Sequence, residues 1–582
     1  MRGRWVLSVL VALAVLAGCT GDGGGSSSAA PANAIEITII YAPESADYLP
    51  TIMNQFNESY RQGINPVTGQ RLAAGERPIF ITGRDGSSGT VMQGIVNAVL
   101  TPNSENVARP TIFQPSVRHW LALANYQARR ELFDLADSPA TANAPVVMAI
   151  WESRLRAIQQ TVGYDNIGWE ELLMVMNSAN GWQDFGLPNA RRTVFYGHTD
   201  PFVSSTGLST LIAEFYAAAR SVGINERTLS LSTVNNEEVR AGVRAIEQLI
   251  RHYSTRTTEF KNYIAQGPDY LDFVALEEND LIAINRGLTA YQPPERLVAL
   301  YPKEGTFFHD HPMAIVNANW VTDEQRAAAR IFIDYVRLPA QQEYIMGFGF
   351  RPVIAGVPLG FPFEAQYGVT KEGPSVLLDP PPPDVIAAVQ NTWEFVKKQA
   401  DIILLIDVSG SMAQDNKLEQ AKTAALAFLD RMESNNRIGL AVFSDALRVE
   451  VPLDNFETNI ARMRERIQQL RPEGGTSLYD ALVEMVTLLN NSTDTDRIRA
   501  VVLLSDGEDT TSTRYRLSDV ESVIRATRND LNPVIVIPVG YGRLPDELIR
   551  VLQRIAAASN TTWQSGDPNN IGRILELISS FF

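Results

Sequence analysis

Residues 401–412 read DIILLIDVSGSM, a run of apolar residues that ends in an aspartate, two serines and a glycine. Isoleucine, leucine and valine favour a buried strand. Where this strand ends, Asp407, Ser409 and Ser411 offer three oxygen-bearing side chains spaced two residues apart. The stretch predicts a strand that leads directly into a polar site.

Predicted strands and helices alternate from residue 401 to residue 582. The strands are IILLID, IGLAVF, AVVLLS and VIVIPVG, and helical patterns such as KLEQAKTAALAFLDRM and DELIRVLQRIAAA lie between them. This alternation implies a parallel sheet with helices on both faces. In such sheets ligands bind beyond the carboxyl ends of the strands. We therefore expect an α/β domain whose site lies at that edge.

Two further oxygen-bearing residues complete the predicted site. Thr476 follows a glycine-rich turn, PEGG, and Asp506 follows the strand AVVLLS. Together with the first three residues they supply only carboxylate and hydroxyl oxygens, without histidine or cysteine. Such ligands suit Mg²⁺ or Mn²⁺ better than zinc. The sequence therefore predicts a site for a hard divalent cation.

The DxSxS…T…D set resembles the metal-ion-dependent adhesion site of von Willebrand factor A domains, and all five positions match. The resemblance implies a Rossmann-like domain over residues 401–582 with a parallel-type central sheet. It also implies that Ser409, Ser411 and Thr476 bind the metal directly, whereas Asp407 and Asp506 act through water or from just outside the ligand set. One coordination position would remain open for a carboxylate of a protein partner. The alternative is a nucleotide-binding or purely structural sheet.

The N-terminus reads MRGRWVLSVLVALAVLAGC, with two arginines before an apolar stretch and the only cysteine at position 19. This pattern is typical of a secretory signal. LAGC resembles the lipobox of bacterial lipoproteins, which implies that Cys19 is lipidated and holds the protein on the extracytoplasmic side of a membrane. An ordinary signal peptide is the alternative. We expect residues 1–19 to be the signal and residues 20–34 a flexible tether.

Composition limits the remaining possibilities. The net charge of −16 argues against a partner that is nucleic acid. A single cysteine excludes an internal disulfide. The roughly 550 residues that follow the tether exceed one hydrophobic core, so two or three domains are expected. The clearest boundary is DPPPPD at 379–384, and we predict a proline-rich linker and connecting helix over residues 376–400.

Residues 35–375 also read as α/β, with three strand–turn–helix units. Their turns read YAPESAD, GRDGSSGT and TDPFVSSTG. Hydroxyl side chains and free backbone N–H groups at a helix start suit an anion or a polar ligand. N-capping alone is the alternative interpretation. The second turn lacks the lysine of a phosphate-binding P-loop, which argues against an NTPase.

The order of these turns resembles bacterial type 2 extracellular solute-binding proteins, particularly the molybdate-like branch. ARPTIFQPSVRHWLALANY (108–126) and YPKEGTFFHDHPMAIV (301–316) are similar to later segments of that family. The resemblance implies two α/β lobes joined by hinge crossovers, with a ligand held between them. It gives these ligand contacts: Ser45, Ser88, and one or more of Ser204, Ser205 and Thr206.

Several other polar and aromatic residues leave two interpretations open. His309 and His311 would share one face of a strand and suggest a metal, but without an apparent third ligand they equally suit a polar surface or hinge. Four aromatic residues are candidates for either the cleft or the core: Trp120, Trp151, Tyr196 and His198.

These features predict a surface-anchored, non-enzymatic lipoprotein that binds a protein partner through Mg²⁺ (or Mn²⁺) and carries a solute-binding-like module. The alternative is a solute receptor of an ABC-type transport or sensing system, docked through its von Willebrand factor A domain. An enzyme is the least supported class, because the motifs contain no recognisable nucleophile and base.

Overall fold

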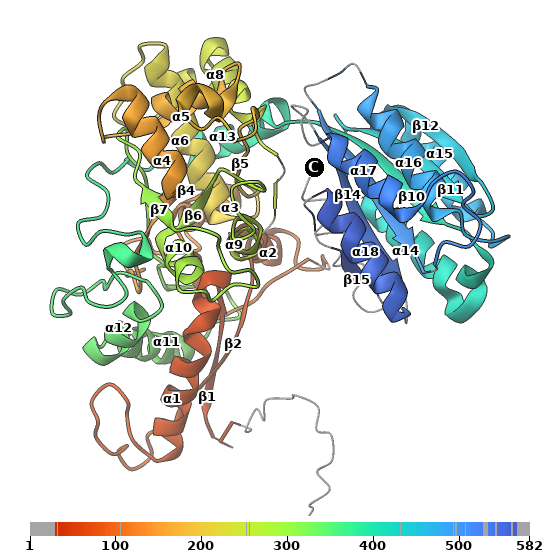
Figure 1. Cartoon of the computed structure of the whole chain (residues 1–582). Coiled ribbons are helices and arrows are strands. Elements are labelled where there is room, and N and C mark those ends of the chain that lie inside the picture. The colour runs from red at the N-terminus through yellow and green to blue at the C-terminus, as the bar shows by residue number, and fades with distance from the viewer. Residues whose placement is uncertain are drawn as a thin grey trace, which may run out of the picture.

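The computed structural model describes residues 30–566 in three sheets with their helices (Figure 1). Cys19, the predicted signal and most of the predicted tether lie outside the described residues. Short gaps in the description fall at residues 32, 105, 252, 255–256, 431, 433, 493, 495–496, 507, 528–532, 542–543, 560 and 562.

The first lobe contains the sheet order β2-β1-β3-β9. Strand β1 is parallel to β2 and to β3, whereas β9 pairs with β3 in the antiparallel sense. Phe56 and Phe332 meet edge to face in the core between the helices and this sheet. The strands are β1 (Ile35–Tyr41), β2 (Ile79–Asp85), β3 (Ile112–Gln114) and β9 (Ala314–Ile315), and the helices are α1 (Leu49–Arg61), α2 (Ser88–Leu100), α11 (Asp323–Val336) and α12 (Pro339–Met346).

The second lobe contains the sheet order β5-β6-β4-β7, and β8 also pairs with β4. Strand β4 is antiparallel to β6, β7 and β8, whereas β5 is parallel to β6, so this sheet is mixed. The strands are β4 (Ala144–Trp151), β5 (Tyr196–Gly197), β6 (Phe273–Glu277), β7 (Leu297–Leu300) and β8 (Phe308–His309). Helix α3 (His119–Ala128) packs against α2. The helices from the second-lobe part of the chain are α4 (Glu152–Val162), α5 (Trp169–Met176), α6 (Ser205–Ser221), α7 (Leu231–Val234), α8 (Glu237–Glu247), α9 (Thr257–Ile264) and α10 (Glu278–Asn285).

Two crossovers join the lobes, as the resemblance to solute-binding proteins implies. The chain leaves the first lobe between α3 and β4, and it returns between β8 and β9. The predicted two-lobed α/β architecture is confirmed. At the contact between the lobes, the Gly89 N–H donates to Val203 O over 3.0 Å. A Cβ at Gly89 would lie 1.9 Å from Phe202 O, so this close approach requires glycine.

Helix α13 (Pro383–Val396) occupies the segment predicted as a linker and connecting helix. It packs against α3, α6, α7 and α8, and Trp393 is buried. The residues before it also contact the front domain, since Leu378 N–H donates to Thr306 O over 2.9 Å. The next strand, β10 (Ala400–Asp407), begins four residues after α13 ends. The connection between the two domains is therefore short and packed.

The C-terminal domain contains the sheet order β12-β11-β10-β13-β14-β15. Its strands are parallel except for the edge strand β12, which is antiparallel to β11. Because β12 is mostly exposed, its apolar pattern is weak, and it was not predicted from the sequence. The strands are β11 (Arg437–Phe443), β12 (Leu447–Asn455), β13 (Ile498–Ser505), β14 (Val534–Tyr541) and β15 (Gln564–Gly566). The helices are α14 (Lys417–Leu429), α15 (Phe456–Gln469), α16 (Leu478–Asn490), α17 (Leu517–Thr527) and α18 (Asp546–Ala558).

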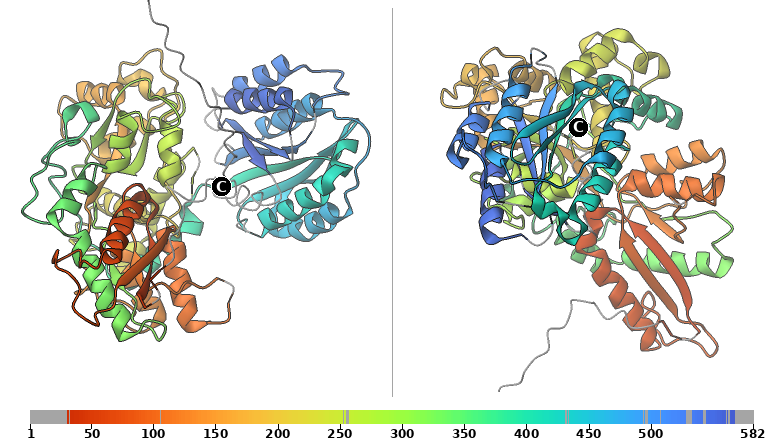
Figure 2. Two further views of the ribbon diagram at one scale, coloured as in Figure 1. Left: turned by 90° about the horizontal axis from the view of Figure 1, so that it is seen from below. Right: turned by 90° about the vertical axis from the view of Figure 1, so that its right-hand side faces the viewer.

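Strand β10 lies in the middle of this sheet, with helices on both faces (Figure 2). All eight of its residues are buried. Leu404 faces one hydrophobic core and Leu405 the other. This double burial explains the uninterrupted apolar run IILLI, because each alternate side chain enters an apolar layer.

Truncation of this strand should therefore be costly. We expect Leu404→Ala to lower the free energy of unfolding of the C-terminal domain by about 2–5 kcal/mol, because it leaves a cavity at a fully buried position. The matched change Val449→Ala, on exposed β12, should stay within about 0.5 kcal/mol. Urea unfolding of the full chain measures both, and equal effects would contradict the central placement of β10.

Candidate functional site

An oxygen-rich cluster lies at the carboxyl edge of the C-terminal sheet. Asp407 and Ser505 are the last residues of the neighbouring strands β10 and β13. Ser505 Oγ donates to Asp407 Oδ2 over 2.7 Å, and the Ser409 N–H donates to Oδ1 over 2.8 Å. Both carboxylate oxygens of Asp407 are therefore fixed by the protein itself.

Hydrogen bonds connect the remaining members of the predicted DxSxS and Asp506 set. Ser409 Oγ lies 3.0 Å from Ser411 Oγ, and Ser411 Oγ donates to Asp506 Oδ1 over 2.7 Å. Neighbouring oxygens around an octahedral Mg²⁺ with bonds of about 2.1 Å lie about 3.0 Å apart. The two serine hydroxyls thus already have the separation that such an ion requires, and the donor set fits the metal implied by the sequence.

Thr476 lies on the loop before α16, and backbone hydrogen bonds join this loop to the cluster. The Gly410 N–H donates to Gly474 O over 3.0 Å, which joins this loop to the serine turn. Gly474 has a φ of 68°, a left-handed conformation that favours glycine. The Thr510 N–H donates to Thr476 O over 2.8 Å, which joins it to the loop after Asp506. All five predicted residues therefore lie on three interconnected loops.

Lys417 is a member of the cluster that sequence reasoning missed. Its Nζ donates to Asp506 Oδ2 over 2.6 Å, and Asp506 is itself fully buried at its side chain. Lys417 is the first residue of α14, in a stretch read only as the start of an amphipathic helix. The carboxylates of Asp407 and Asp506 carry two negative charges, and the Lys417 ammonium carries one positive charge. The site therefore has one net negative charge.

Part of the cluster reaches the surface. Asp407 and Ser409 are buried, Ser411 is half-buried, and the turn residues from Ala413 to Asn416 are exposed. Burial is the largest influence on Asp407 and raises the pKa of its carboxyl to about 6, with a smaller contribution from the nearby Asp506 charge. A cation bound here would offset that desolvation, and its outer side would face the surface.

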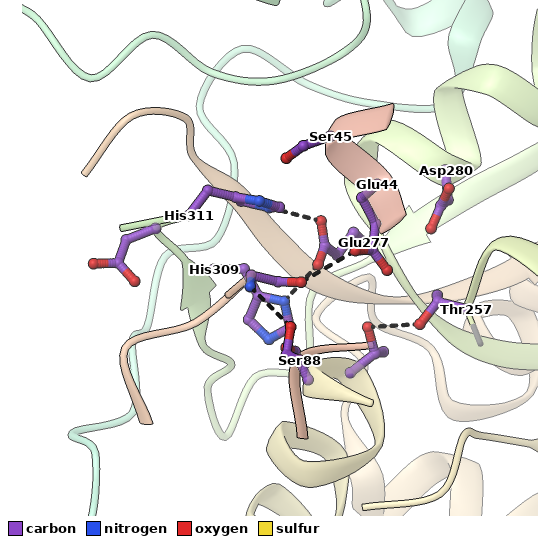
Figure 3. A network of polar contacts seen from close by, with 12 residues as sticks. Glu44, Ser45, Ser88, Thr257, Glu277, Asp280, His309 and His311 are labelled. Carbon is purple, nitrogen blue, oxygen red and sulfur yellow. Dashed lines mark hydrogen bonds and ion pairs between the residues drawn. The ribbon is translucent and has the colours of Figure 1, made fainter. Parts of the chain in front are cut away.

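A second polar cluster lies where the two lobes of the front domain meet (Figure 3). Glu277, at the end of β6, accepts hydrogen bonds at both carboxylate oxygens, from His309 Nδ1 over 2.7 Å and from His311 Nε2 over 3.1 Å. His309 is the last residue of β8 and His311 lies in the crossover that follows. Both are buried, so they do not form a polar surface. Glu44, from the turn after β1, accepts from Ser116 Oγ over 3.1 Å. Carboxylates from both lobes therefore converge at the hinge.

The electrostatics of this cluster follow from burial. Desolvation is the main cause that raises the pKa of Glu44 to about 8, helped by the charges of Glu277 and Asp280. Burial also raises the pKa of Asp280 to about 6, although Lys261 lies 3.4 Å away and opposes the change. Burial acts in the same direction on Glu277, but the facing histidines outweigh it and lower its pKa to about 2.

The predicted contacts Ser45 and Ser88 lie beside this cluster in the first lobe (Figure 3). Ser45 Oγ lies 2.9 Å from Tyr48 Oη, and Ser88 Oγ accepts from the Ser116 N–H over 3.2 Å. Both side chains are buried and bonded within the protein.

The other three predicted contacts start helix α6 in the second lobe. Ser204 is its N-cap and accepts from the Gly207 N–H. Ser205 Oγ accepts from Trp120 Nε1 over 2.9 Å, and Thr206 Oγ1 accepts from Thr257 Oγ1 over 3.2 Å. In this arrangement all three hydroxyls bind other protein groups.

Glu44, Glu277 and Asp280 were not identified from the sequence. Glu44 is more than two hundred residues away from Glu277 and Asp280 in the chain, and single acidic residues at turns and helix starts are common on surfaces. The available signal was the placement of Glu277 directly after the apolar run FVAL.

Comparison with known proteins finds a family match in the C-terminal domain. Residues 402–508 match the family model of the von Willebrand factor type A domain. Inter-alpha-trypsin inhibitor heavy chain H2 of Mus musculus is 25% identical over 178 residues, which cover 28% of this chain and 19% of that protein. The chain thus spans about a fifth of the length of the curated relatives it matches first.

Two solved structures are among those with partial similarity to this chain. A von Willebrand factor type A protein from Catenulispora acidiphila is 21% identical, with a TM-score of 0.28, and the match covers 32% of this chain and 42% of that one. A periplasmic thiamin binding protein is 13% identical, with a TM-score of 0.41, and the match covers 62% of this chain and 96% of that one.

The chain therefore contains a segment, residues 402–508, that matches the von Willebrand factor type A domain, and it follows a two-lobed α/β front domain. Within residues 30–566, apart from the gaps given above, the helices include none that is both long and apolar enough to cross a membrane.

The raised pKa of Glu44 predicts how the stability of the front domain depends on pH. Folding raises this pKa from an ordinary value of 4.5 to about 8, so between these values the folded state binds more protons than the unfolded chain. The free energy of unfolding should then fall as pH rises, by up to about 1.4 kcal/mol per pH unit from this group. Glu44→Gln should remove this contribution and flatten the pH dependence, as measured by urea unfolding between about pH 5 and pH 8.

The matched control is Glu36→Gln, an exposed position on β1. It should leave the pH dependence of the wild-type protein unchanged. If the free energy of unfolding of Glu44→Gln depended on pH as strongly as that of the wild type, the dependence would come from other groups. That result would contradict the prediction.

Proposed function

We propose that the protein is a surface-anchored, non-enzymatic binding lipoprotein whose C-terminal domain binds a protein partner through Mg²⁺ or Mn²⁺. The observation that carries this proposal is the convergence of Asp407, Ser409, Ser411 and Asp506 in one hydrogen-bonded cluster, with the loop of Thr476 against it. Its oxygens have the chemistry of a hard-cation site.

The charge of the cluster supports recognition of a carboxylate. Two aspartates and Lys417 leave one net negative charge, and a divalent cation would change this to one net positive charge. An Asp or Glu side chain from a partner would then neutralise the site while it completes the metal coordination. The exposed turn beside Ser411 leaves room for such an approach.

Anchoring is proposed from the N-terminal sequence. The signal pattern and LAGC would place a lipid on Cys19, and residues 20–34 would hold the folded domains away from the bilayer. The protein would then face the extracytoplasmic side, where a partner on the same or another surface is accessible.

Mg²⁺ should stabilise the C-terminal domain of the wild-type chain. We expect an upward shift of one thermal transition with Mg²⁺ or Mn²⁺, absent in Asp407→Ala, because that carboxylate orients the serine turn. The control Asp430→Ala, at an exposed position on α14's C-terminal end, should retain the shift. Metal-dependent capture of a protein with an exposed acidic residue, lost with EDTA, tests the partner. Capture that ignores both EDTA and Asp407→Ala would contradict the proposal.

The front domain supports a second candidate, a receptor for a small polar solute. Carboxylates and hydroxyls of both lobes meet at the hinge, and Asp280 Oδ2 is buried without a hydrogen-bond partner among the described residues. A ligand with hydrogen-bond donors would satisfy this oxygen when the lobes close on it.

A solute screen by thermal unfolding tests this candidate. A ligand at one hundred times its dissociation constant should stabilise the front domain by about 2.7 kcal/mol. Asp280→Asn should weaken the effect, whereas Asp323→Asn, on the exposed start of α11, should not. If no compound in a broad set of polar metabolites shifts the transition, the receptor function loses its support.

A further inference from the structure

A third polar cluster lies inside the second lobe, away from both sites described above. It consists of His198, directly after β5, Glu214 on α6 and Glu247 at the end of α8. All three side chains are 0% exposed. His198 Nε2 lies 2.9 Å from Glu247 Oε1 and 4.0 Å from Glu214 Oε1. Within the part of the chain that the structure describes, this is the only group of three metal-ligating side chains whose atoms all lie within 4.8 Å.

The orientation of the imidazole is fixed by its other nitrogen. His198 Nδ1 lies 2.7 Å from Thr199 O, and a carbonyl oxygen can only accept, so Nδ1 carries the proton. In a neutral ring Nε2 then presents a lone pair toward two carboxylates. Histidines that bind metals commonly donate their second ring N–H to a backbone carbonyl in this way.

Two tyrosines fix the carboxylates. Tyr196 Oη donates to Glu214 Oε1 over 3.1 Å, and Tyr253 Oη donates to Glu247 Oε2 over 2.8 Å. Hydrogen bonds of this kind orient the ligating groups of metal sites from outside. Glu214 Oε2, in contrast, is buried and has no hydrogen-bond partner among the described residues.

The charges in this cluster require cations. With a neutral imidazole, two carboxylates carry two negative charges in a volume without water access. Either two protons or one divalent ion would balance them, and only the ion would also occupy the lone pairs of Nε2 and of both carboxylates.

We propose that His198, Glu214 and Glu247 bind a divalent transition-metal ion, with Zn²⁺ as the best match. Ligands around a tetrahedral zinc with bonds of about 2.0–2.1 Å lie about 3.3 Å apart, and the two measured separations from Nε2 lie on either side of that value. The imidazole nitrogen separates this site from the all-oxygen cluster of the C-terminal domain, since imidazole favours zinc and carboxylate with hydroxyl favours Mg²⁺.

The position of the site gives the ion a structural role at the connection between the domains. Trp393 of α13 packs on His198 with ring centroids 5.4 Å apart and on Tyr253 at 5.1 Å. The Lys398 N–H, two residues before β10, donates to Tyr253 Oη over 3.0 Å. An ion bound to His198 and Glu247 would restrict the motion of His198 and Tyr253, which contact α13 and the residues before β10.

Metal analysis of the full chain tests the proposal. Because the three ligands are fully buried, the ion must enter during folding, so the protein is produced in zinc-supplemented medium and then dialysed against EDTA with excess Mg²⁺. We expect one zinc per chain to remain in the wild type and in Asp407→Ala, and none in the double variant Glu214→Gln/Glu247→Gln. Glutamine preserves the size of each side chain and removes its charge.

A second measurement keeps the test decisive if the double variant does not fold. Wild-type chain produced with Co²⁺ in place of zinc should show the visible absorption of tetrahedral cobalt with nitrogen and oxygen ligands. A wild-type protein that contains neither zinc nor this cobalt spectrum would overturn the proposal and show that protons balance the cluster. Equal zinc in the wild type and in a folded double variant would overturn it as well.

Discussion

The burial of β10 on both faces is the constraint on which the C-terminal domain depends. A strand enclosed by two apolar layers can carry charge only at its ends, and β10 does so at Asp401 and Asp407. At the first end, Arg497 Nε donates to Asp401 over 2.6 Å, and Arg437 binds the same carboxylate. At the other end the strand presents Asp407 to the serine turn. The apolar layers therefore fix the position of Asp407, and with it the oxygen cluster, at the carboxyl edge of the sheet.

The C-terminal site could be predicted because its members follow strands that are themselves obvious in the sequence. Asp407, Ser409 and Ser411 lie within five residues, and Asp506 follows an unbroken apolar run. Lys417 was missed because a lysine at a helix start has many ordinary explanations. In the front domain, the turns at the helix starts were predicted from the sequence, but the acidic residues that converge near them were not. Glu44 and Glu277 meet only after two lobes and a crossover are assembled, and no local pattern indicates that long-range contact.

The helix α13 illustrates the same limit in a different way. The four prolines indicate a change in the chain, but they give no information on what the next helix packs against. Trp393 is buried against His198 and Tyr253, and Arg251 of the front domain donates to Ser559 O of the C-terminal domain over 3.1 Å. One continuous hydrophobic core extends from the second lobe through α13 to one face of the C-terminal sheet. The two modules therefore share packing, so a change in one lobe has a physical path to the other domain.

The direction of β10 has a mechanical consequence. The chain enters the C-terminal domain at Ala400, next to α13, and reaches the oxygen cluster at Asp407. A pull between a partner at that cluster and an anchor before the front domain would act along the axis of the strand. The hydrogen bonds of β10 with β11 and β13 would then carry the load in shear and share it, instead of opening one after another. Tension applied in this geometry would therefore act on several hydrogen bonds of β10 at the same time.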